Sequence, residues 1–559
     1  MTELLTAAQM RAIEKAAIDA GEVTGLELME RAGQGVVDAI FEEWPALRRV
    51  GETHRAVVLC GPGNNGGDGF VVARLLKEAG WEVEVFLYGD PKKLPPDAKV
   101  NYERWGQTGV TIPLSEIRRS YYQGAGLVID AFFGTGLARP LPLECSIPIR
   151  DAYINQDQPN GPRIVALDVP SGLCADSGFF LHDDDDGRNW IGCHLTVTFH
   201  QAKLGHYLER GLTLCARIIK ADIGLPPIDR RWVRGKGFVP PLPVALLSSD
   251  EKQLAGLGNR LGKAKHKHHK YSHGHALILS GGVGKGGAAR LAARGALRIG
   301  AGAVTLGAPP AALIENAAQL NAIMLTAFKD ADSLTETLQD KRINALCLGP
   351  GLGLGAREKE LIVAALDQRS PGLDPGPQTQ AARRGPGSSP GLRPIVLDAD
   401  VLTHLAQDDT LFGKLHAKCI LTPHAGEFAR LFPDFAEKLN APATKGPAYS
   451  KVDATRDAAK RAGCVVLFKG PDTVIADPSG RCSINASVYE RSAPWLATAG
   501  SGDVLAGFIT GLLARGFQPM QAAETGAWLH TECALGFGPG LIAEDIPEEL
   551  PKVFQKLGV

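Results

Sequence analysis

The sequence predicts an α/β protein with two domains, each built around a mostly parallel β-sheet. Short strand-like apolar runs alternate with helical segments along the 559-residue chain, which is typical of parallel sheets covered on both faces. The alternation stops at residues 226–243, where five prolines occur, and then starts again. We therefore expect one domain over residues 1–235 and a larger one over residues 236–559.

Composition excludes several classes of protein. Lys and Arg number 60 against 61 Asp and Glu, for a net charge of −1, whereas general nucleic-acid binders carry a clear basic excess. The first residues lack the basic and apolar regions of a signal peptide, and no uncharged apolar stretch reaches the roughly 18–20 residues of a membrane span. Ten scattered Cys without a CxxC pattern indicate a reducing compartment. We expect a cytoplasmic protein that binds neither nucleic acid nor membranes.

The first half begins with two expected helices. Thr6 can cap a helix over residues 7–20, and residues 26–44 form a second amphipathic pattern. A further helix is expected over residues 70–79. The strand-like runs of this half are residues 56–60, 83–88, 126–131, 163–169 and 195–199.

The second half repeats the pattern at greater length. Residues 371–394 are rich in Pro, Gly, Gln and Ser and carry too little apolar surface to offset the entropy of ordering, so we expect a flexible insertion. The acidic run 182–187 is expected to be a solvated loop rather than a cation site, and the basic run 263–270 a loop rather than a metal site. The strand-like runs of this half are residues 275–281, 302–307, 344–351, 394–400, 419–426, 464–470 and 473–480.

A glycine-rich segment follows the first strand-like run. Residues 60–70 read CGPGNNGGDGF and lie between a strand and a helix, where backbone N–H groups and the helix dipole can face an anion. Such a segment is weak evidence by itself, because tight turns also use glycine. Asn64, Asn65 and Asp68 add side-chain oxygens that suit a sugar, an amide or a cation.

Polar residues also follow other strands of the first half. Asp130 and Asp168 each end a strand, and Ser171 lies just beyond the second. Ligands bind beyond the carboxyl ends of parallel strands, so these residues together predict one site, although a single Asp in such a place is commonly a loop cap. Lys203 follows the strand at 195–199. It can act as an acid or base if burial lowers its pKa, or pair with a phosphate or carboxylate.

Several longer motifs occur in order between residues 5 and 225: AAQMRAIEKAAI, LMERAG, GPGNNGGDGFVVAR, VIDAFFGTGL, LDVPSG and TVTFHQAKLGH. With these motifs the first half resembles the NAD(P)H-hydrate epimerase domain, the YjeF N-terminal family. The resemblance implies a Rossmann-like three-layer fold and a bound potassium ion. It also implies interconversion of the R and S forms of NAD(P)H hydrated at C6 of the nicotinamide ring.

The same resemblance implies roles for single residues. The potassium ligands would be Asn65, Asp130 and Ser171, whose oxygens suit a hard cation. Asp168 and Lys203 are the catalytic candidates, as acid and base in an order that the sequence leaves open. The substrate-binding residues would be Asn64, Asn65, Gly66, Gly67, Asp68, Gly134, Thr135, Gly136, Leu137, Ala138, Arg139, Pro140 and Asp168.

In the second half, WLATAGSGDVLAGF leads from a glycine-rich turn into an apolar helix. Gly500 to Gly502 would place N–H groups at the helix N-terminus, where phosphate charge develops. Asp503 either complements the helix dipole or acts as a general base that takes a proton from a hydroxyl attacking phosphorus. There is no Walker A motif, so P-loop phosphoryl transfer is excluded.

Further motifs follow other strands of this half: SGGVGKGGAARLAARGALRIGAGAVTL, GPGLG, VLDADVL, LTPHAGEFARL, FKGPDTVIADPSG and TAGSGDVLAG. Over about residues 260–555 they resemble the NAD(P)H-hydrate dehydratase family, of ribokinase-like fold. The resemblance implies that ADP or ATP phosphorylates the C6 hydroxyl of the S-hydrate, with Mg²⁺ bridging the phosphates, and that phosphate is then eliminated. It places Ala288, Gly353, His424 and Asp503 at the hydrate, with Asp503 as the base, and Lys469, Gly470, Pro471, Asp472, Thr473 and Gly502 at the nucleotide.

Three motifs depart from the usual pattern of that family. DADALN reads DADVLT over 398–403, PHPGE has Ala425, and TGGSGD has Ala499. The last lies nearest the chemistry. A methyl at Ala499 would weaken the anion-binding turn if that position needs a positive φ.

The sequence thus predicts a bifunctional repair enzyme, expected to be a homo-oligomer. ADP is the expected nucleotide because the fused arrangement resembles the bacterial form. Two alternatives remain. One is a ribokinase-type small-molecule kinase with an accessory domain, which would leave a stable phosphorylated product. The other is a first domain that binds nucleotide without catalysis.

Overall fold

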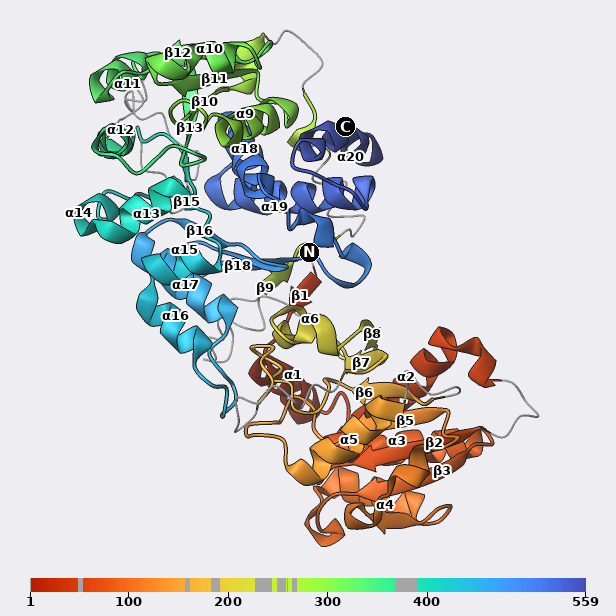
Figure 1. The fold of residues 1–559 in the computed structure, drawn as a ribbon. Helices are drawn as coiled ribbons and strands as arrows, with labels where there is room; N and C mark the ends of the chain where they lie inside the picture. Colours follow the sequence, from red (N-terminus) through yellow and green to blue (C-terminus); the bar gives the residue numbers. More distant parts are fainter. Residues whose placement is uncertain are drawn as a thin grey trace. The chain divides into compact units, whose positions relative to one another are not determined.

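The computed structural model of this chain describes residues 2–48, 54–155, 161–181, 192–226, 244–248, 258, 260–263, 269–367 and 391–559. It divides into two compact units. The first comprises residues 3–243 together with 441–450, and the second comprises 1–2, 244–440 and 451–559. Among the described residues, every helix is too short or too polar to cross a membrane. Each unit is an α/β structure, which confirms the predicted fold class (Figure 1).

The first unit follows the expected alternation of strands and helices. Thr6 caps the first long helix through its hydroxyl, as expected, and a reciprocal bond from Gln9 completes a capping box. The elements are β1 (Thr2–Leu4), α1 (Ala7–Asp19), α2 (Gly25–Glu43), β2 (Arg55–Cys60), α3 (Asn64–Glu78), β3 (Glu82–Leu87), α4 (Pro96–Trp105), β4 (Thr111–Pro113), β5 (Leu127–Ala131), α5 (Leu143–Asn155), β6 (Arg163–Leu167), β7 (Leu195–Phe199), α6 (Gly211–Leu214) and β8 (Arg217–Ala221).

The sheet of this unit has the order β4-β3-β2-β5-β6-β7-β8, and its neighbouring strands are parallel. Val58 and Ile129 lie in the core beneath α2, α3 and α4, whereas Val57 and Val128 lie in the core beneath α5. This alternation with period two is what a strand covered on both faces requires. The strand order reverses between β2 and β5, which makes this the switch point where ligands bind in open parallel sheets.

The second unit is larger, and its elements continue the chain. They are β9 (Val244–Leu246), β10 (His275–Leu279), α9 (Gly287–Arg298), β11 (Ala303–Ala308), α10 (Leu313–Ala317), β12 (Met324–Ala327), α11 (Ala331–Thr337), β13 (Ile343–Leu348), α12 (Ala356–Asp367), β14 (Ile395–Leu397), α13 (Asp400–Gln407), α14 (Asp409–Phe412), β15 (Cys419–Leu421), α15 (Ala425–Leu431), α16 (Pro433–Asn440), α17 (Lys451–Ala462), β16 (Val465–Phe468), β17 (Asp472–Ala476), β18 (Cys482–Ala486), α18 (Ser501–Ala514), α19 (Pro519–Phe537) and α20 (Asp545–Lys556).

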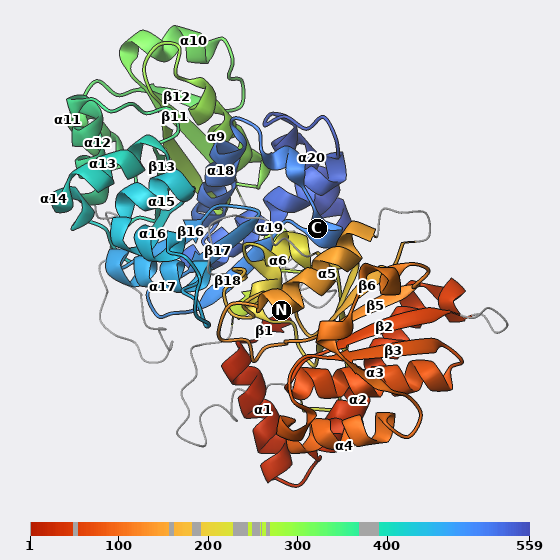
Figure 2. The ribbon, with the colours of Figure 1, turned by 60° about the horizontal axis from the view of Figure 1, so that its bottom comes forward.

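From β9 onwards, its sheet has the order β9-β18-β17-β16-β15-β14-β13-β10-β11-β12. The strands from β12 to β16 are parallel, and β16, β17 and β18 form an antiparallel meander. One face packs against α9, α18, α19 and α20 in a single apolar core, while α12, α13, α15 and α17 lie on the other side (Figure 2). The strand order reverses between β10 and β13, so this sheet also has a switch point.

Most sequence-based elements are confirmed, but three boundaries are wrong. The run 419–426 was expected to be one strand, yet β15 ends at Leu421 and α15 begins at Ala425. The glycine-rich segment 60–70 was expected to be a loop, yet α3 begins at Asn64. Gly66 and Gly67 therefore lie inside the helix, where a Cβ would overlap the Gly61 carbonyl or the Met29 side chain. The run 394–400 was expected to be one strand, but β14 ends at residue 397 and α13 begins at Asp400.

Three predictions fall on residues outside the described part of the chain. They are the acidic run 182–187, nearly all of the insertion 371–394, and most of the basic run 263–270. The expected domain boundary at 235/236 also lies outside it and stays a prediction. The antiparallel meander was not expected, because periodicity shows that a strand exists but not the direction of its neighbour.

A glycine lies at each switch point, where it allows two loops to meet. A Cβ at Gly61, after β2, would overlap the carbonyl oxygen of Phe132, after β5. A Cβ at Gly281, after β10, would overlap the carbonyl oxygen of Gly351, after β13. Backbone atoms cannot turn aside as a side chain can, so any side chain here would push the two loops apart.

We expect Gly61→Ala and Gly281→Ala each to lower the free energy of unfolding by about 1–3 kcal/mol, because the added methyl overlaps neighbouring backbone. Gly63→Ala and Gly282→Ala are matched controls, since a Cβ at either position meets no atom within 4 Å. Their expected cost is below about 1 kcal/mol. Urea unfolding of the full chain measures all four. Equal costs in test and control variants would show that these glycines do not serve the loop contact.

Candidate active sites

The first candidate site lies at the β2/β5 switch point. A Cβ at Gly134 would lie 2.8 Å from Asn65 Oδ1 and 3.5 Å from Asp168 Cβ, so the loops after β2, β5 and β6 meet here. The Nδ2 atom of Asn65 is buried and has no hydrogen-bond partner in the described part of the chain. A buried donor without a partner is costly, and a bound ligand would satisfy it.

Asp168 and Lys203 form a buried ion pair in this site. The Lys203 ammonium is fully buried and donates to Asp168 Oδ1 at 2.6 Å, Thr198 Oγ1 at 2.9 Å and the Phe199 carbonyl at 3.0 Å. All three of its protons are therefore engaged. Burial disfavours the charged form of Asp168, but Lys203 outweighs burial and holds the pKa of Asp168 below its ordinary value.

The backbone at Asp168 is strained, with φ at 64°. His206 holds it there. The backbone N–H of Lys203 donates to His206 Nδ1 at 3.1 Å, so the opposite ring nitrogen carries a proton and donates to the Asp168 carbonyl at 2.9 Å. Burial and the Lys203 charge lower the pKa of His206 to about 4, which keeps the ring neutral. In the sequence, the only signal for His206 is its place in the TVTFHQAKLGH motif.

Two more carboxyl groups surround the pair. Burial, Asp168 and Glu14 raise the pKa of Asp68 well above its ordinary value, and burial and Asp168 raise that of Glu14. Glu14 lies on α1, which the Arg11 guanidinium links to the Thr135 carbonyl at 3.4 Å. Sequence reasoning missed Glu14, although its helical spacing from Arg11 places both on one face. In this site the pKa of Asp168 is therefore lowered, whereas the pKa values of its carboxyl neighbours Asp68 and Glu14 are raised.

Asp130 and Ser171 are in direct contact next to this group. Ser171 donates its backbone N–H to Asp130 Oδ2 at 2.8 Å and its hydroxyl to Oδ1 at 2.6 Å. Burial raises the pKa of Asp130 to about 6, although the bonds from Ser171 oppose this. Among the described residues, Asn65 makes no hydrogen bond to this pair, so direct contact joins two of the three expected potassium ligands. Of the loop 134–140, Gly136, Ala138 and Arg139 are exposed and the others are half-buried.

The second candidate site lies at the β10/β13 switch point of the other unit. Its main carboxylate is Asp503, in the first turn of α18. This side chain makes no hydrogen bond to any described residue. Burial and the charge of Asp398 raise the pKa of Asp503 to about 7, while Lys469 opposes the rise and Asp400 and Glu427 add to it. A half-buried carboxyl with a pKa near neutrality suits a general base.

The backbone of the turn before α18 shows whether position 499 needs a positive φ. Gly500 takes the left-handed conformation, with φ at 86°, whereas Ala499 is not among the described residues with positive φ. The expected weakening of the turn is therefore not found, because the position that needs glycine has it. Ser501 and Gly502 open the helix as expected, and a Cβ at Gly502 would lie 3.5 Å from Lys469 Nζ.

Lys469 links the two sides of this site. Its ammonium lies 3.0 Å from Asp398 Oδ1 and 3.8 Å from Glu427 Oε2. Burial disfavours this charge, but Asp398 and Glu427 outweigh it and raise the pKa of Lys469. Asp398 also accepts a hydrogen bond from Thr422 at 2.8 Å. In the sequence, Asp398 is indicated only as part of the VLDADVL motif. Its signal is its place directly after a buried strand, as for Asp130 and Asp168.

The turn 469–473 has less free side-chain capacity than expected. Asp472 forms a buried ion pair with Lys451 at 2.5 Å, and Thr473 bonds within the turn to the Gly470 carbonyl at 2.7 Å. Lys451 was not expected, because it precedes the turn by a whole helix. Because its carboxylate is bonded to Lys451, Asp472 contributes to the shape of the turn. The turn also enters β17 at Asp472 rather than ending after Thr473.

His424 caps α15. Its Nδ1 accepts a hydrogen bond from the backbone N–H of Gly426 at 3.0 Å. The backbone N–H of His424 donates to Glu427 Oε2 at 2.8 Å, which completes a capping box. The ring nevertheless leaves 56% of its side-chain surface exposed, although its Nε2 lies 3.5 Å from Glu427 Oε1. Of the other expected hydrate residues, Ala288 lies 3.5 Å from the position of a Cβ on Gly351, beside the loop that carries Gly353.

Comparison with known proteins gives matches to both units. A family model described as YjeF-related protein N-terminus matches residues 25–205, and one described as NAD(P)H-hydrate dehydratase matches residues 276–538. The bifunctional NAD(P)H-hydrate repair enzyme of Moorella thermoacetica is 34% identical over 578 residues, covering 99% of this chain and 97% of that protein. NAD(P)H-hydrate epimerase of Rhodobacter capsulatus is 48% identical over 207 residues, covering 37% of this chain and 92% of that protein.

A solved structure resembles the larger unit. It is the ADP/ATP-dependent NAD(P)H-hydrate dehydratase from Bacillus subtilis, co-crystallised with ATP and Mg²⁺. The likeness covers 56% of this chain and 99% of that chain, at 24% identity and a TM-score of 0.42.

Lys203→Met tests the buried ion pair. We expect it to lower the free energy of unfolding by about 3–5 kcal/mol, because it leaves the Asp168 carboxylate buried without a cation. In the native protein the depressed pKa of Asp168 contributes stability above pH ~4, and that stability is lost as pH falls through this range. In the variant the pKa of Asp168 would rise instead, so the difference in stability should be larger at pH 7.5 than at pH 4.5.

Lys15→Met is the matched control, since Lys15 pairs with Asp19 on the exposed face of α1 and its loss should change stability little. The double variant Lys203→Met/Asp168→Asn should recover part of the stability, because it removes the unpaired charge. Urea unfolding at both pH values measures each. A pH-independent loss that Asp168→Asn fails to relieve would mean that Lys203 acts through packing alone.

Proposed function

Because this chain belongs to the family of bifunctional NAD(P)H-hydrate repair enzymes, we propose that its two units catalyse successive reactions. The first unit interconverts R- and S-NAD(P)H hydrate. The second converts the S form to NAD(P)H at the expense of ADP or ATP, releasing AMP or ADP and phosphate. The unpaired Asp503 carboxylate at the start of α18 is the single observation that best supports the second reaction.

In the proposed epimerisation, Asp168 is the group that exchanges a proton with the C6 substituents. One oxygen of Asp168 is held by Lys203 and Thr198, and the other makes no hydrogen bond to a described residue. The engaged ammonium of Lys203 fits a positioning role better than proton transfer. Asp68, with its raised pKa, is suited to supply the complementary proton. The expected substrate residues 64–68 and 134–140 flank this carboxylate.

We propose that potassium binds beside the same site. Asn65, Asp130 and Ser171 offer amide, carboxylate and hydroxyl oxygens, the donor types that hard cations prefer. The buried charge of Asp130 favours a compensating cation, so the residues present fit the ion. When bound, potassium would supply a positive charge that orients polar groups of the substrate.

In the proposed dehydration, Asp503 removes the proton of the C6 hydroxyl as that oxygen attacks the terminal phosphorus of ADP. The phosphorylated hydrate then loses phosphate from C6 and a proton from C5, which restores the double bond. Lys469 and the N–H groups at the start of α18 face the developing phosphate charge. Gly470, Pro471 and Thr473 shape the nucleotide turn, with Gly502 opposite.

Mg²⁺ is the expected metal of this site. The described residues contain no group of three His, Cys, Asp or Glu side chains arranged to hold a metal ion. Mg²⁺ commonly keeps several waters and binds through substrate phosphates, so this donor set fits an ion carried mainly by the nucleotide. When bound, it would neutralise phosphate charge.

We also propose a cytoplasmic enzyme that forms homo-oligomers. All ten Cys are free, which supports a reducing compartment. On α5, Leu143, Ile147 and Ile154 are exposed apolar side chains, and a second copy would cover them. Light scattering of the full chain measures the oligomeric state, and a monomer at micromolar concentration would contradict that part of the proposal.

The central test follows absorbance of reduced nicotinamide after mixing the protein with R- and S-NADH hydrate, potassium and Mg²⁺. We expect complete, nucleotide-dependent recovery of NADH from both epimers, faster with ADP than with ATP. Recovery of the S portion alone would contradict the epimerase. A phosphorylated product without NADH would favour a small-molecule kinase.

The pH dependence of the second reaction tests the role of Asp503. Because the pKa of Asp503 is about 7, kcat/KM for the S-hydrate should be half-maximal near pH 7, level off about one pH unit higher, and fall about tenfold per pH unit well below it. Asp503→Asn should reduce kcat about 10²–10⁴-fold while ADP still binds. Asp398→Asn should move the acid limb to lower pH, since it removes a charge that raises this pKa. A profile that is flat from pH 5.5 to 8 would exclude Asp503 as the base.

A further inference from the structure

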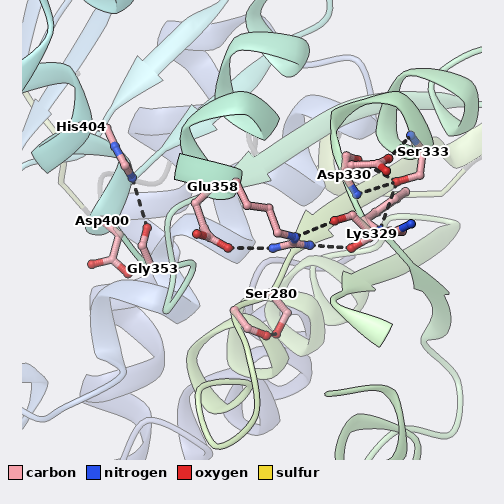
Figure 3. A network of polar contacts seen from close by, with 11 residues as sticks. Ser280, Lys329, Asp330, Ser333, Gly353, Glu358, Asp400 and His404 are labelled. Atoms are coloured by element: carbon pink, nitrogen blue, oxygen red, sulfur yellow. Dashed lines mark hydrogen bonds and ion pairs between the residues drawn. The ribbon is translucent and has the colours of Figure 1, made fainter. Parts of the chain in front are cut away.

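Gly353, one of the expected hydrate contacts, is held by two side chains of a single helix. Its backbone N–H donates to Asp400 Oδ2 at 2.8 Å, and its carbonyl lies 3.2 Å from His404 Nε2 (Figure 3). A carbonyl can only accept, so this ring nitrogen carries a proton and donates. Asp400 and His404 are four residues apart on α13 and therefore share one face.

The backbone of Gly353 needs this support. Its φ is 107°, a conformation that side chains other than glycine rarely adopt. From the far side, Glu358 of α12 lies against it, with Cγ 3.6 Å from the position that a Cβ would take. Arg357 holds that helix start in place through Glu358 at 2.7 Å and the Lys329 carbonyl at 2.9 Å (Figure 3).

This arrangement limits what Gly353 can offer a ligand. Both of its backbone polar groups already make a bond within the protein, so its Cα surface is the main feature that it presents to a ligand. A surface of this kind recognises a ligand by shape, and a small shift of it would misplace the reacting hydroxyl. Helix α13, which carries Asp400 and His404, begins two residues after Asp398. Asp398 pairs with Lys469 on the nucleotide side. One junction, from β14 to α13, therefore fixes both sides of the site.

We propose that Asp400 and His404 are positioning residues for dehydration, which hold the Gly353 peptide as a bare surface on which the hydrate lies within reach of Asp503. This inference rests on the proposed function. Asp400 has a second effect, because its charge faces Asp503 together with Asp398, Glu427 and Lys469. The simpler alternative is that Asp400 only complements the dipole of α13 and that the clamp only stabilises the fold.

Paired substitutions distinguish a positioning role of Asp400 and His404 from a role in stability alone. Asp400→Leu and His404→Leu each remove one bond to Gly353, whereas Asp400→Asn keeps an acceptor oxygen and His404→Gln keeps an N–H donor at similar reach. We expect the Leu variants to lower kcat/KM for S-NADH hydrate about 10–100-fold, and the conservative variants to stay within about threefold of the native value. KM for ADP and the epimerase rate should stay within about twofold in all four.

The epimerase rate of the same full-length chain is the internal control for folding. Asp400→Asn should also move the acid limb of the dehydration profile to lower pH, since it keeps the bond but removes a negative charge facing Asp503. His404→Gln should leave that limb unchanged. This difference reports the charge of Asp400 at Asp503, whereas the loss of hydrate kcat/KM in the Leu variants, with unchanged KM for ADP, reports the bonds to Gly353.

The inference is overturned if the Leu variants keep kcat/KM within threefold of native. It is also overturned if hydrate kinetics, ADP kinetics and thermal stability all decline together. If His404→Leu does not fold, His404→Phe serves in its place, since it retains the ring without the donor. A native chain that forms no NADH would contradict the proposed function and this inference with it, whereas an active chain with unaffected variants contradicts the inference alone.

Discussion

At each switch point, two loops meet backbone to backbone, and the rest of each site depends on that contact. Gly61 meets the loop after β5 in the first unit, and Gly281 meets the loop after β13 in the second. The carboxyl ends of the strands would otherwise diverge, because strand order reverses there and the sheets twist. Close contact brings residues from three or four strands near one another. Asn65, Gly134 and Asp168 form one such group, and Asp398, Lys469 and Asp503 form the other.

The two sites differ in how their main carboxylates are paired with a lysine. In the first, the Asp168 carboxylate is fixed by a buried ammonium whose three protons are engaged, and the pKa values of the neighbouring carboxyl groups are raised. In the second, Lys469 is shared between Asp398 and Glu427, and Asp503 has no hydrogen-bond partner among the described residues. An unpaired carboxylate in a half-buried, negatively charged setting has its pKa raised towards neutrality. The first site thus suits proton exchange with a fixed carboxylate, and the second suits a base that gains and loses a proton near pH 7.

Several polar residues near the sites serve the fold, and this restricts what the ligands can use. The carboxylate of Asp472 is occupied by Lys451, Thr473 bonds within its own turn, and His424 caps a helix. The turn 469–473 and the loop that carries Gly353 therefore present mainly backbone and Cα surface. Such surfaces discriminate by shape and by N–H direction rather than by side-chain charge. They stay in place only while the residues behind them are intact.

The sequence by itself determined the α/β class, most strand positions, and the residues that end the strands, since these depend on local periodicity and on residue type. Its long ordered motifs were also enough to identify the family. The tertiary structure decided what local pattern cannot contain: the antiparallel meander, the start of α3 at Asn64, and which charges pair. Lys203 with Asp168 and Lys451 with Asp472 are separated by many residues, and only the folded sheet brings them together. Glu14, His206, Asp400 and His404 entered the sites in the same way, because their roles depend on contacts between elements that sequence spacing does not specify.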